Sequence, residues 1–237
     1  MDEEIKTANP LGYQKISKLL RSLAIPAIIA NLVNALYNVV DQIFIGQGIG
    51  YLGNAATNIA FPITTICLAI GLTLGIGGAS NFNLELGKGN PEKSKHTAGT
   101  AASTLIIIGI ILCISIRIFL EPLMISFGAT DKILQYAMEY TGITSYGIPF
   151  LLFSIGVNPL VRADGNARYS MMAIIVGAVL NTILDPLFMF VFHWGIAGAA
   201  WATVISQVVS ASLLLVYFPK FKSVKFSLND FIPQVHY

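Results

Sequence analysis

The sequence predicts an all-α fold, a polytopic membrane protein built as a bundle of six transmembrane helices. Charged residues make up 11% of the 237 residues, against about 25% in an ordinary soluble domain. Hydrophobic residues reach 55%, and the mean hydropathy is +0.72. A soluble domain could not cover its surface with so few charges, so the composition excludes a soluble enzyme, a nucleic-acid-binding protein and a disordered chain. The net charge of +2 indicates no polyanionic partner.

Long stretches without charge locate the helices, because a span needs about 20 apolar residues. The uncharged run between Asp41 and Glu85 is too long for one helix, and the glycine-rich stretch 46–53 is expected to form a turn within it. His193 to Gly195 divides the last two spans in the same way. We expect the six spans at 20–45, 55–80, 97–120, 133–160, 169–192 and 197–218.

The positive charges predict the orientation. Twelve of the fourteen Lys and Arg residues fall on one side of a six-helix arrangement, and only Arg117 and Lys132 fall on the other. Cytoplasmic segments carry the excess of Lys and Arg. We therefore expect a multi-pass protein of the plasma (inner) membrane with both termini in the cytoplasm. Residues 1–18 would form an N-terminal tail, 19–219 the six-helix lobe, and 220–237 a cytoplasmic tail.

Two carboxylates lie inside predicted spans. Asp41 falls in the first span and Asp185 in the fifth. An ionised Asp near the bilayer centre costs about 2.5–3.5 kcal/mol and usually faces the bundle interior, where it serves a function. Asn34 and Asn38 share a helical face with Asp41, and Tyr37 borders that face.

Further polar side chains lie on other spans. Asn181 lies one helical turn before Asp185, and the sixth span carries Thr203 and Gln207. The fourth span carries Tyr140 and Asn158. If these faces converge, they form a wet pocket whose oxygens suit Na⁺ or a proton, and the residues leave that choice open. Interhelical hydrogen bonding without transport is the alternative for the amides and hydroxyls.

Proline and glycine add expectations about helix geometry. Pro26 and Pro186 lie within or beside spans, where each removes a helix hydrogen bond. A break at Pro186 would free a carbonyl beside Asp185, and a packing kink is the alternative. Gly71 and Gly75 form a G-x-x-x-G pattern, which is typical of close helix packing and, second, of a sliding surface.

Three stretches of this sequence carry a resemblance to a known family. They run from Ile25-Pro26 through Tyr37-Asn38-Val39-Val40-Asp41 to Gly46, from Arg162-Ala163-Asp164-Gly165-Asn166 to Arg168, and from Leu180-Asn181-Thr182 through Asp185-Pro186 to Phe188. With them, residues 15–225 resemble the N-terminal lobe of a multidrug and toxic compound extrusion (MATE) transporter. The combination is specific, although each stretch alone is weak.

The resemblance implies a twelve-helix transporter of two six-helix lobes that rock against each other. Such proteins export cationic or amphipathic organic compounds and take up H⁺ or Na⁺ in exchange. Positions matching the family's N-lobe cation site are Asp41, Asn181, Asp185 and Thr203. Those matching the surrounding hydrogen-bond network and the bend of the first helix are Tyr37, Tyr140, Asn158 and Pro26.

The implied partners are the lipid bilayer, an organic cation or drug-like substrate, and the coupling ion. No cofactor is expected other than a bound Na⁺. The family pattern also needs a second lobe, whereas this sequence stops at Tyr237. Residues 220–237 resemble the start of the linker between lobes. The chain is then a fragment, a half-size subunit that pairs with a second copy, or a degraded gene product.

Two other functions compete. A flippase for anionic lipid-linked precursors should carry Arg or Lys inside its cavity, and here every Lys and Arg falls outside the spans or at their edges. An intramembrane prenyl-transfer enzyme needs clustered Asp, and a metalloprotease needs H-E-x-x-H, neither of which occurs in the sequence. The sequence therefore favours a cation-coupled exporter.

Overall fold

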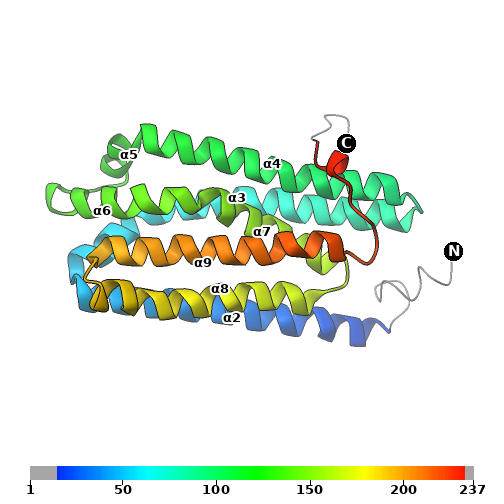
Figure 1. Ribbon diagram of the computed structural model, residues 1–237, viewed down its shortest axis with the longest axis horizontal. Helices are drawn as coiled ribbons and strands as arrows, with labels where there is room; N and C mark the ends of the chain where they lie inside the picture. Colours follow the sequence, from blue (N-terminus) through cyan, green and yellow to red (C-terminus); the bar gives the residue numbers. More distant parts are fainter. Residues whose placement is uncertain (1–14, 233–237) are drawn as a thin grey trace.

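The computed structural model describes residues 15–232, with the side chains of residues 228 and 229 left aside. This part of the chain is helical and contains no strand (Figure 1). Its α-helices are α2 (Ile16–Gly48), α3 (Tyr51–Gly87), α4 (Pro91–Ile118), α5 (Leu120–Ser126), α6 (Asp131–Thr144), α7 (Ile148–Ala163), α8 (Ala167–Pro186) and α9 (Gly195–Tyr217). Shorter turns are η2 (Ser145–Gly147), η3 (Leu187–Val191), η4 (Phe218–Lys220) and η5 (Leu228–Phe231).

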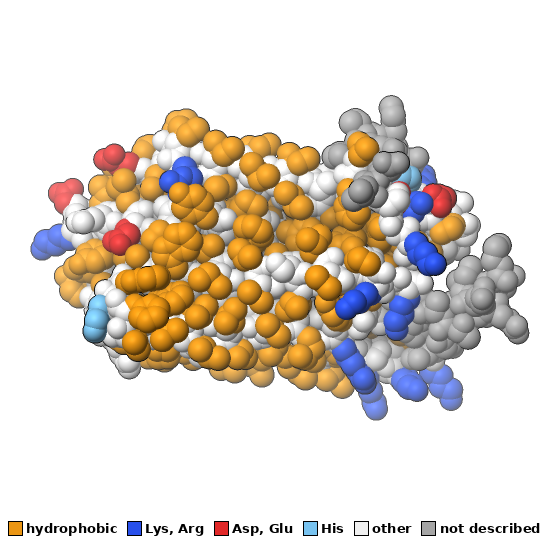
Figure 2. Space-filling view, in the orientation of Figure 1, with side chains coloured by type: hydrophobic (Ala, Val, Ile, Leu, Met, Phe, Trp, Pro, Cys, Tyr) orange, Lys and Arg blue, Asp and Glu red, His pale blue; other side chains and the backbone are white. Residues whose placement is uncertain are grey.

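Six stretches of helix in the described residues are long and apolar enough to cross a membrane, which confirms the predicted number. The fourth stretch joins α6, η2 and α7, and the fifth joins α8 and η3. Hydrophobic side chains cover the middle of the bundle, and charged side chains gather at its two ends (Figure 2). An apolar belt between two polar ends is what a bilayer requires of a multi-pass protein.

The helices extend further than predicted. The turn expected within 46–53 is present but shorter than the glycine-rich stretch, because α2 continues to Gly48 and α3 begins at Tyr51, so only two residues separate them. Gly50 makes this turn with a φ of 82°, which glycine adopts at little cost.

At the other end of α3, the Glu85 carboxylate lies 2.9 Å from Lys88 Nζ and also accepts a hydrogen bond from Asn90. These two contacts satisfy the buried carboxylate, so α3 continues beyond residue 80 into polar sequence.

The two prolines do not break the chain into separate helices. Pro26 is buried within α2, which is one continuous helix. Pro186 ends α8, and the wider π-helical turns of Leu187–Val191 follow directly. A π-helical turn is one way to accommodate a missing backbone donor. The expected break at Pro186 therefore takes the form of a local widening of the helix.

The α7 helix occupies the centre of the bundle, packed against α3, α4 and α9. The G-x-x-x-G pattern of α3 forms part of this packing. A Cβ at Gly75 would lie 2.5 Å from the backbone of Gly156 on α7, and a Cβ at Gly71 would lie 2.7 Å from Ile155. Only glycine permits this approach, so Gly71 and Gly75 form a packing face.

On the other side of the bundle, α2 packs along α8, and α8 packs along α9. This arrangement brings the helix with Asp41 beside the helix with Asp185 (Figure 1). Much of α2 stays uncovered: Leu32 and Leu36 are 58% and 55% exposed, and Asn31, Asn34 and Asn38 are also exposed. The α2 helix therefore presents a mixed polar and apolar surface outward.

The segment after α9 is tied to the bundle by a buried carboxylate. Asp164, in the loop between α7 and α8, is fully buried. Its Oδ2 accepts hydrogen bonds from Tyr217 Oη at 2.8 Å and Lys222 N at 2.9 Å, and its Oδ1 accepts one from Ser223 N at 2.9 Å. Asp164 thereby joins the α7–α8 loop to the end of α9 and the chain beyond it.

Candidate functional site

The two predicted carboxylates meet inside the bundle. Asp41 on α2 is 7% exposed, and Asp185 on α8 is fully buried. Their side chains are close enough to interact directly. A carboxyl group donates only when it is protonated. The geometry therefore fits a pair that shares one proton or, with both groups ionised, one bound cation.

Asn181 and Thr203 complete the surroundings of the pair. Asn181 lies one turn before Asp185 on α8, and its Nδ2 donates to Asp185 Oδ1 at 3.2 Å. The same nitrogen lies 3.5 Å from Thr203 Oγ1 on α9. Tyr140 of α6 lines a small hollow together with Thr203. Four helices thus contribute to one polar cluster inside an apolar bundle.

Three buried oxygens in this cluster lack a hydrogen-bond partner within the described part of the chain. They are Asp41 Oδ1, Asn181 Oδ1 and Asp185 Oδ2. A buried polar atom without a partner costs about 1–3 kcal/mol. Carboxylate and amide oxygens are ligands that hard cations prefer. The cluster therefore has the donor chemistry of a site for a small hard cation or a proton.

A cavity of about 210 Å³ begins beside this cluster. Its polar lining comes from α2, α7, α8 and α9 and consists of Asn31, Asn34, Tyr37, Ser154, Asn158, Arg162, Asn181, Thr203, Ser206, Gln207 and Ser210. Leucine and isoleucine side chains of α3, α7 and α8 line the rest. Asp41 and Asp185 are not among the lining residues, whereas Asn181, which donates to Asp185, and Thr203 are.

Most of the predicted site residues belong to this cavity or to the carboxylate cluster. Asn158 is 4% exposed and accepts a hydrogen bond from Ser170 Oγ. Tyr140 lines a smaller hollow of about 50 Å³, which shares Thr203 and Gln207 with the cavity. Thr203 and Gln207 line both hollows, so the two hollows adjoin at these residues.

Asn38 and Pro26 lie outside the cavity lining. Asn38 was expected on the pocket face of its helix, but it is exposed and donates to the backbone oxygen of Asn34 at 2.7 Å. Asn38 lies on the exposed side of α2, whereas Asp41 is among the buried residues of this helix. Pro26 is buried in α2 and lines no part of the cavity.

The sequence reasoning missed two lining residues of α7, Ser154 and Arg162. Arg162 was assigned to a loop, yet it lies in the last turn of α7 and lines the cavity. Ser154, Asn158 and Arg162 are spaced four residues apart, which places them on one helical face. This spacing could have identified both residues. Arg162 lies at the end of its span, as expected, but its side chain lines the cavity, so the argument that no Lys or Arg enters the cavity does not hold for this residue.

The curated relatives of this chain include proteins named for multidrug export or multidrug resistance. The multidrug export protein MepA of Staphylococcus haemolyticus is 26% identical over 218 residues, covering 90% of this chain and 47% of MepA. The probable multidrug resistance protein YoeA of Bacillus subtilis is 29% identical over 224 residues, covering 90% of this chain and 48% of YoeA. The chain thus spans about half the length of the curated relatives it matches.

Solved structures give the same result. The structure of MATE in complex with MaD3S superposes with a TM-score of 0.87 at 27% sequence identity, covering 98% of this chain and 52% of that one. The described helices therefore have the arrangement of one half of a MATE transporter. The sequence model of the MatE family matches residues 26–187, which includes both carboxylates and the loop between α7 and α8. The chain belongs to the MatE family.

Proposed function

We propose that the chain is one lobe of a cation-coupled exporter of cationic or amphipathic organic compounds, in which Asp41 and Asp185 hold the coupling ion. The observation that carries the proposal is the buried pair itself, with its unpartnered oxygens next to a cavity. Two ionised carboxylates close to each other repel strongly in an apolar interior. One H⁺ or Na⁺ between them removes that repulsion.

The cavity gives the substrate a place near the ion. Its lining combines amide and hydroxyl groups and the guanidinium of Arg162 with aliphatic side chains, which suits a molecule with polar and apolar parts. An organic cation in the cavity lies near the negative charge that the bound ion neutralises. Substrate and ion therefore stabilise the same charge and compete for it. The names of the curated relatives, which are multidrug export or resistance proteins, support this substrate class.

A second lobe, or a second copy of this chain, is the proposed partner. The uncovered face of α2 with Asn31, Asn34 and Asn38 supports this, because exposed amides are costly against lipid. The basic end of the bundle, where α2 begins and α3 meets α4, is proposed to face the cytoplasm of a plasma membrane (Figure 2). Both termini would then lie on the cytoplasmic side.

Binding of a radiolabelled lipophilic cation, tetraphenylphosphonium, to the purified chain tests this function. The proposal expects saturable binding that weakens as either Na⁺ or H⁺ is raised. Asn158→Leu, which places an aliphatic group in the cavity lining, should weaken binding about tenfold. Asn58→Leu changes an exposed amide of α3 outside the cavity and should leave binding unchanged. Binding that neither ion affects, or that Asn158→Leu leaves intact, would contradict the proposal.

A further inference from the structure

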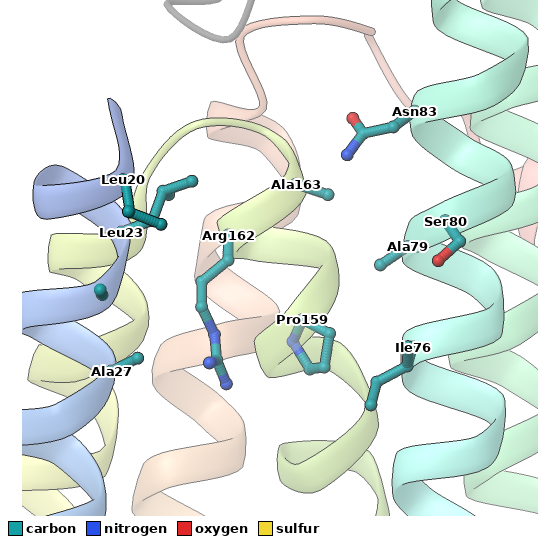
Figure 3. A pocket seen from close by; sticks show the side chains of 11 residues that line it. Leu20, Leu23, Ala27, Ile76, Ala79, Ser80, Asn83, Pro159, Arg162 and Ala163 are labelled. Carbon is teal, nitrogen blue, oxygen red and sulfur yellow. The ribbon is translucent and has the colours of Figure 1, made fainter. Parts of the chain in front are cut away.

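Arg162 lies between two hollows. It lines the polar cavity, and it also lines a larger hollow of about 450 Å³ between α2, α3 and α7. In Figure 3 its side chain extends from α7 into the gap between Leu20, Leu23 and Ala27 of α2 and the facing residues of α3. The lining residues of this hollow come from the part of the bundle near the start of α2 and the end of α3 (Figure 1), where Lys and Arg side chains gather (Figure 2).

The guanidinium of Arg162 has no partner among residues 15–232. Its Nε is buried without a hydrogen bond, and no ion pair to this side chain occurs in that part of the chain. Arginine remains protonated in proteins, so the positive charge persists. A half-buried charge without a counter-ion is costly, whereas a bidentate bond to a phosphate or carboxylate is strong. Arg162 therefore points to an anionic ligand.

The side chains that line the hollow indicate what the anionic ligand carries besides its negative charge. Leu20, Leu23, Ala24 and Ala27 of α2 face Ile76 and Ala79 of α3 across it. Ser80 and Asn83 supply the polar groups on the α3 side. Leu20 is 66% exposed, so the hollow is open toward the surroundings of α2. Aliphatic walls with a hydroxyl, an amide and a guanidinium match an acyl chain joined to a polar, anionic head group.

We propose that this hollow binds an anionic phospholipid, with the lipid phosphate on Arg162 and an acyl chain along α2 and α3. Basic pockets between helices near the cytoplasmic surface bind anionic head groups in this way. Lys15, Lys18 and Arg21 at the start of α2 add positive charge at the same end. The bound phosphate also cancels the positive charge of Arg162 at one end of the polar cavity. The proposal does not rest on ion coupling, and it takes only the cytoplasmic orientation of this end of the bundle from the proposed function.

Native mass spectrometry of the purified chain with added phosphatidylglycerol or phosphatidylcholine tests the assignment. Wild type should retain phosphatidylglycerol in preference, and Arg162→Gln should weaken its retention at least tenfold. Ala27→Phe fills the hollow without changing charge and should weaken it as well. Arg168→Gln removes an exposed charge at the same end, outside the hollow, and should behave like wild type.

Three results would overturn the proposal. The first is equal retention by wild type and folded Arg162→Gln. The second is equal retention of both lipids by wild type. The third is displacement of phosphatidylglycerol by millimolar inorganic phosphate, which would assign the site to a free anion instead of a lipid. Gel filtration establishes folding for each variant, and if Arg162→Gln does not fold, undiminished retention by Ala27→Phe overturns the proposal.

Discussion

Replacing Asp164 by Ala should destabilise the bundle, because one buried carboxylate holds three donors. These are Tyr217 Oη, Lys222 N and Ser223 N, all within 2.9 Å of a carboxylate oxygen. Hydrogen bonds to a charged group contribute about 1.5–3 kcal/mol each. The variant also removes the cost of burying the charge, so the net loss is below the sum. We expect the free energy of unfolding to fall by roughly 3–5 kcal/mol.

A thiol-reactive dye measures this loss. Cys67 is 1% exposed, so it reacts only when the bundle opens. In a Cys113→Ser background Cys67 is the single thiol, because the chain has 2 cysteines. For a chain of this size, 1 kcal/mol corresponds to about 2–4 °C of melting temperature, so Asp164→Ala should melt roughly 6–20 °C lower. Trypsin should also cleave faster at Lys222, which loses its backbone bond to Asp164.

The matched control is Glu139→Ala, which removes an exposed carboxylate from α6. It should melt within about 2 °C of the parent, because surface substitutions usually change stability by less than 0.5 kcal/mol. If Asp164→Ala melts as high as Glu139→Ala, the carboxylate does not join the α7–α8 loop to α9, and the reasoning is refuted.

Two further substitutions test the packing and the polar cluster. Gly75→Val should prevent folding or lower the melting temperature strongly, because its Cβ would lie 2.5 Å from the backbone of Gly156. A Cβ at Gly77 meets nothing within 4 Å, so Gly77→Val should be tolerated. Equal melting curves for the two variants would contradict the proposed packing. Asn181→Leu removes the hydrogen-bond donor to Asp185 Oδ1. It should weaken cation binding about tenfold, as measured by an equilibrium titration with Na⁺ or H⁺. An unchanged affinity of the variant for the ion would exclude Asn181 from the site.

The number of spans and the carboxylate pair were predictable because both follow from the cost of charge in lipid. The uncharged runs located every span, and the same cost indicated that Asp41 and Asp185 face inward. The ends of the helices were harder to predict. The polar end of α3 remains helical because Lys88 and Asn90 satisfy the buried Glu85. These contacts depend on side chains of the following turn and produce no periodic pattern in the sequence.

The cavity lining was predictable only in part, because spacing along one helix gives a face but not its neighbour. Asn34 and Asn38 share a face, yet only Asn34 lines the cavity. Arg162 was missed because its backbone lies at the end of α7, while its long side chain reaches back along the helix. Long arginine side chains commonly separate the charge from the backbone position in this way.

Counting the ions that the purified chain binds tests the carboxylate pair most directly. The chain should bind one Na⁺, or release one proton as pH rises, through Asp41 and Asp185 together. The double variant Asp41→Asn, Asp185→Asn should lose that ion while still eluting as a folded protein. Asp131→Asn, at an exposed carboxylate of α6, should retain it. One ion bound by the double variant with the affinity of wild type would contradict the account.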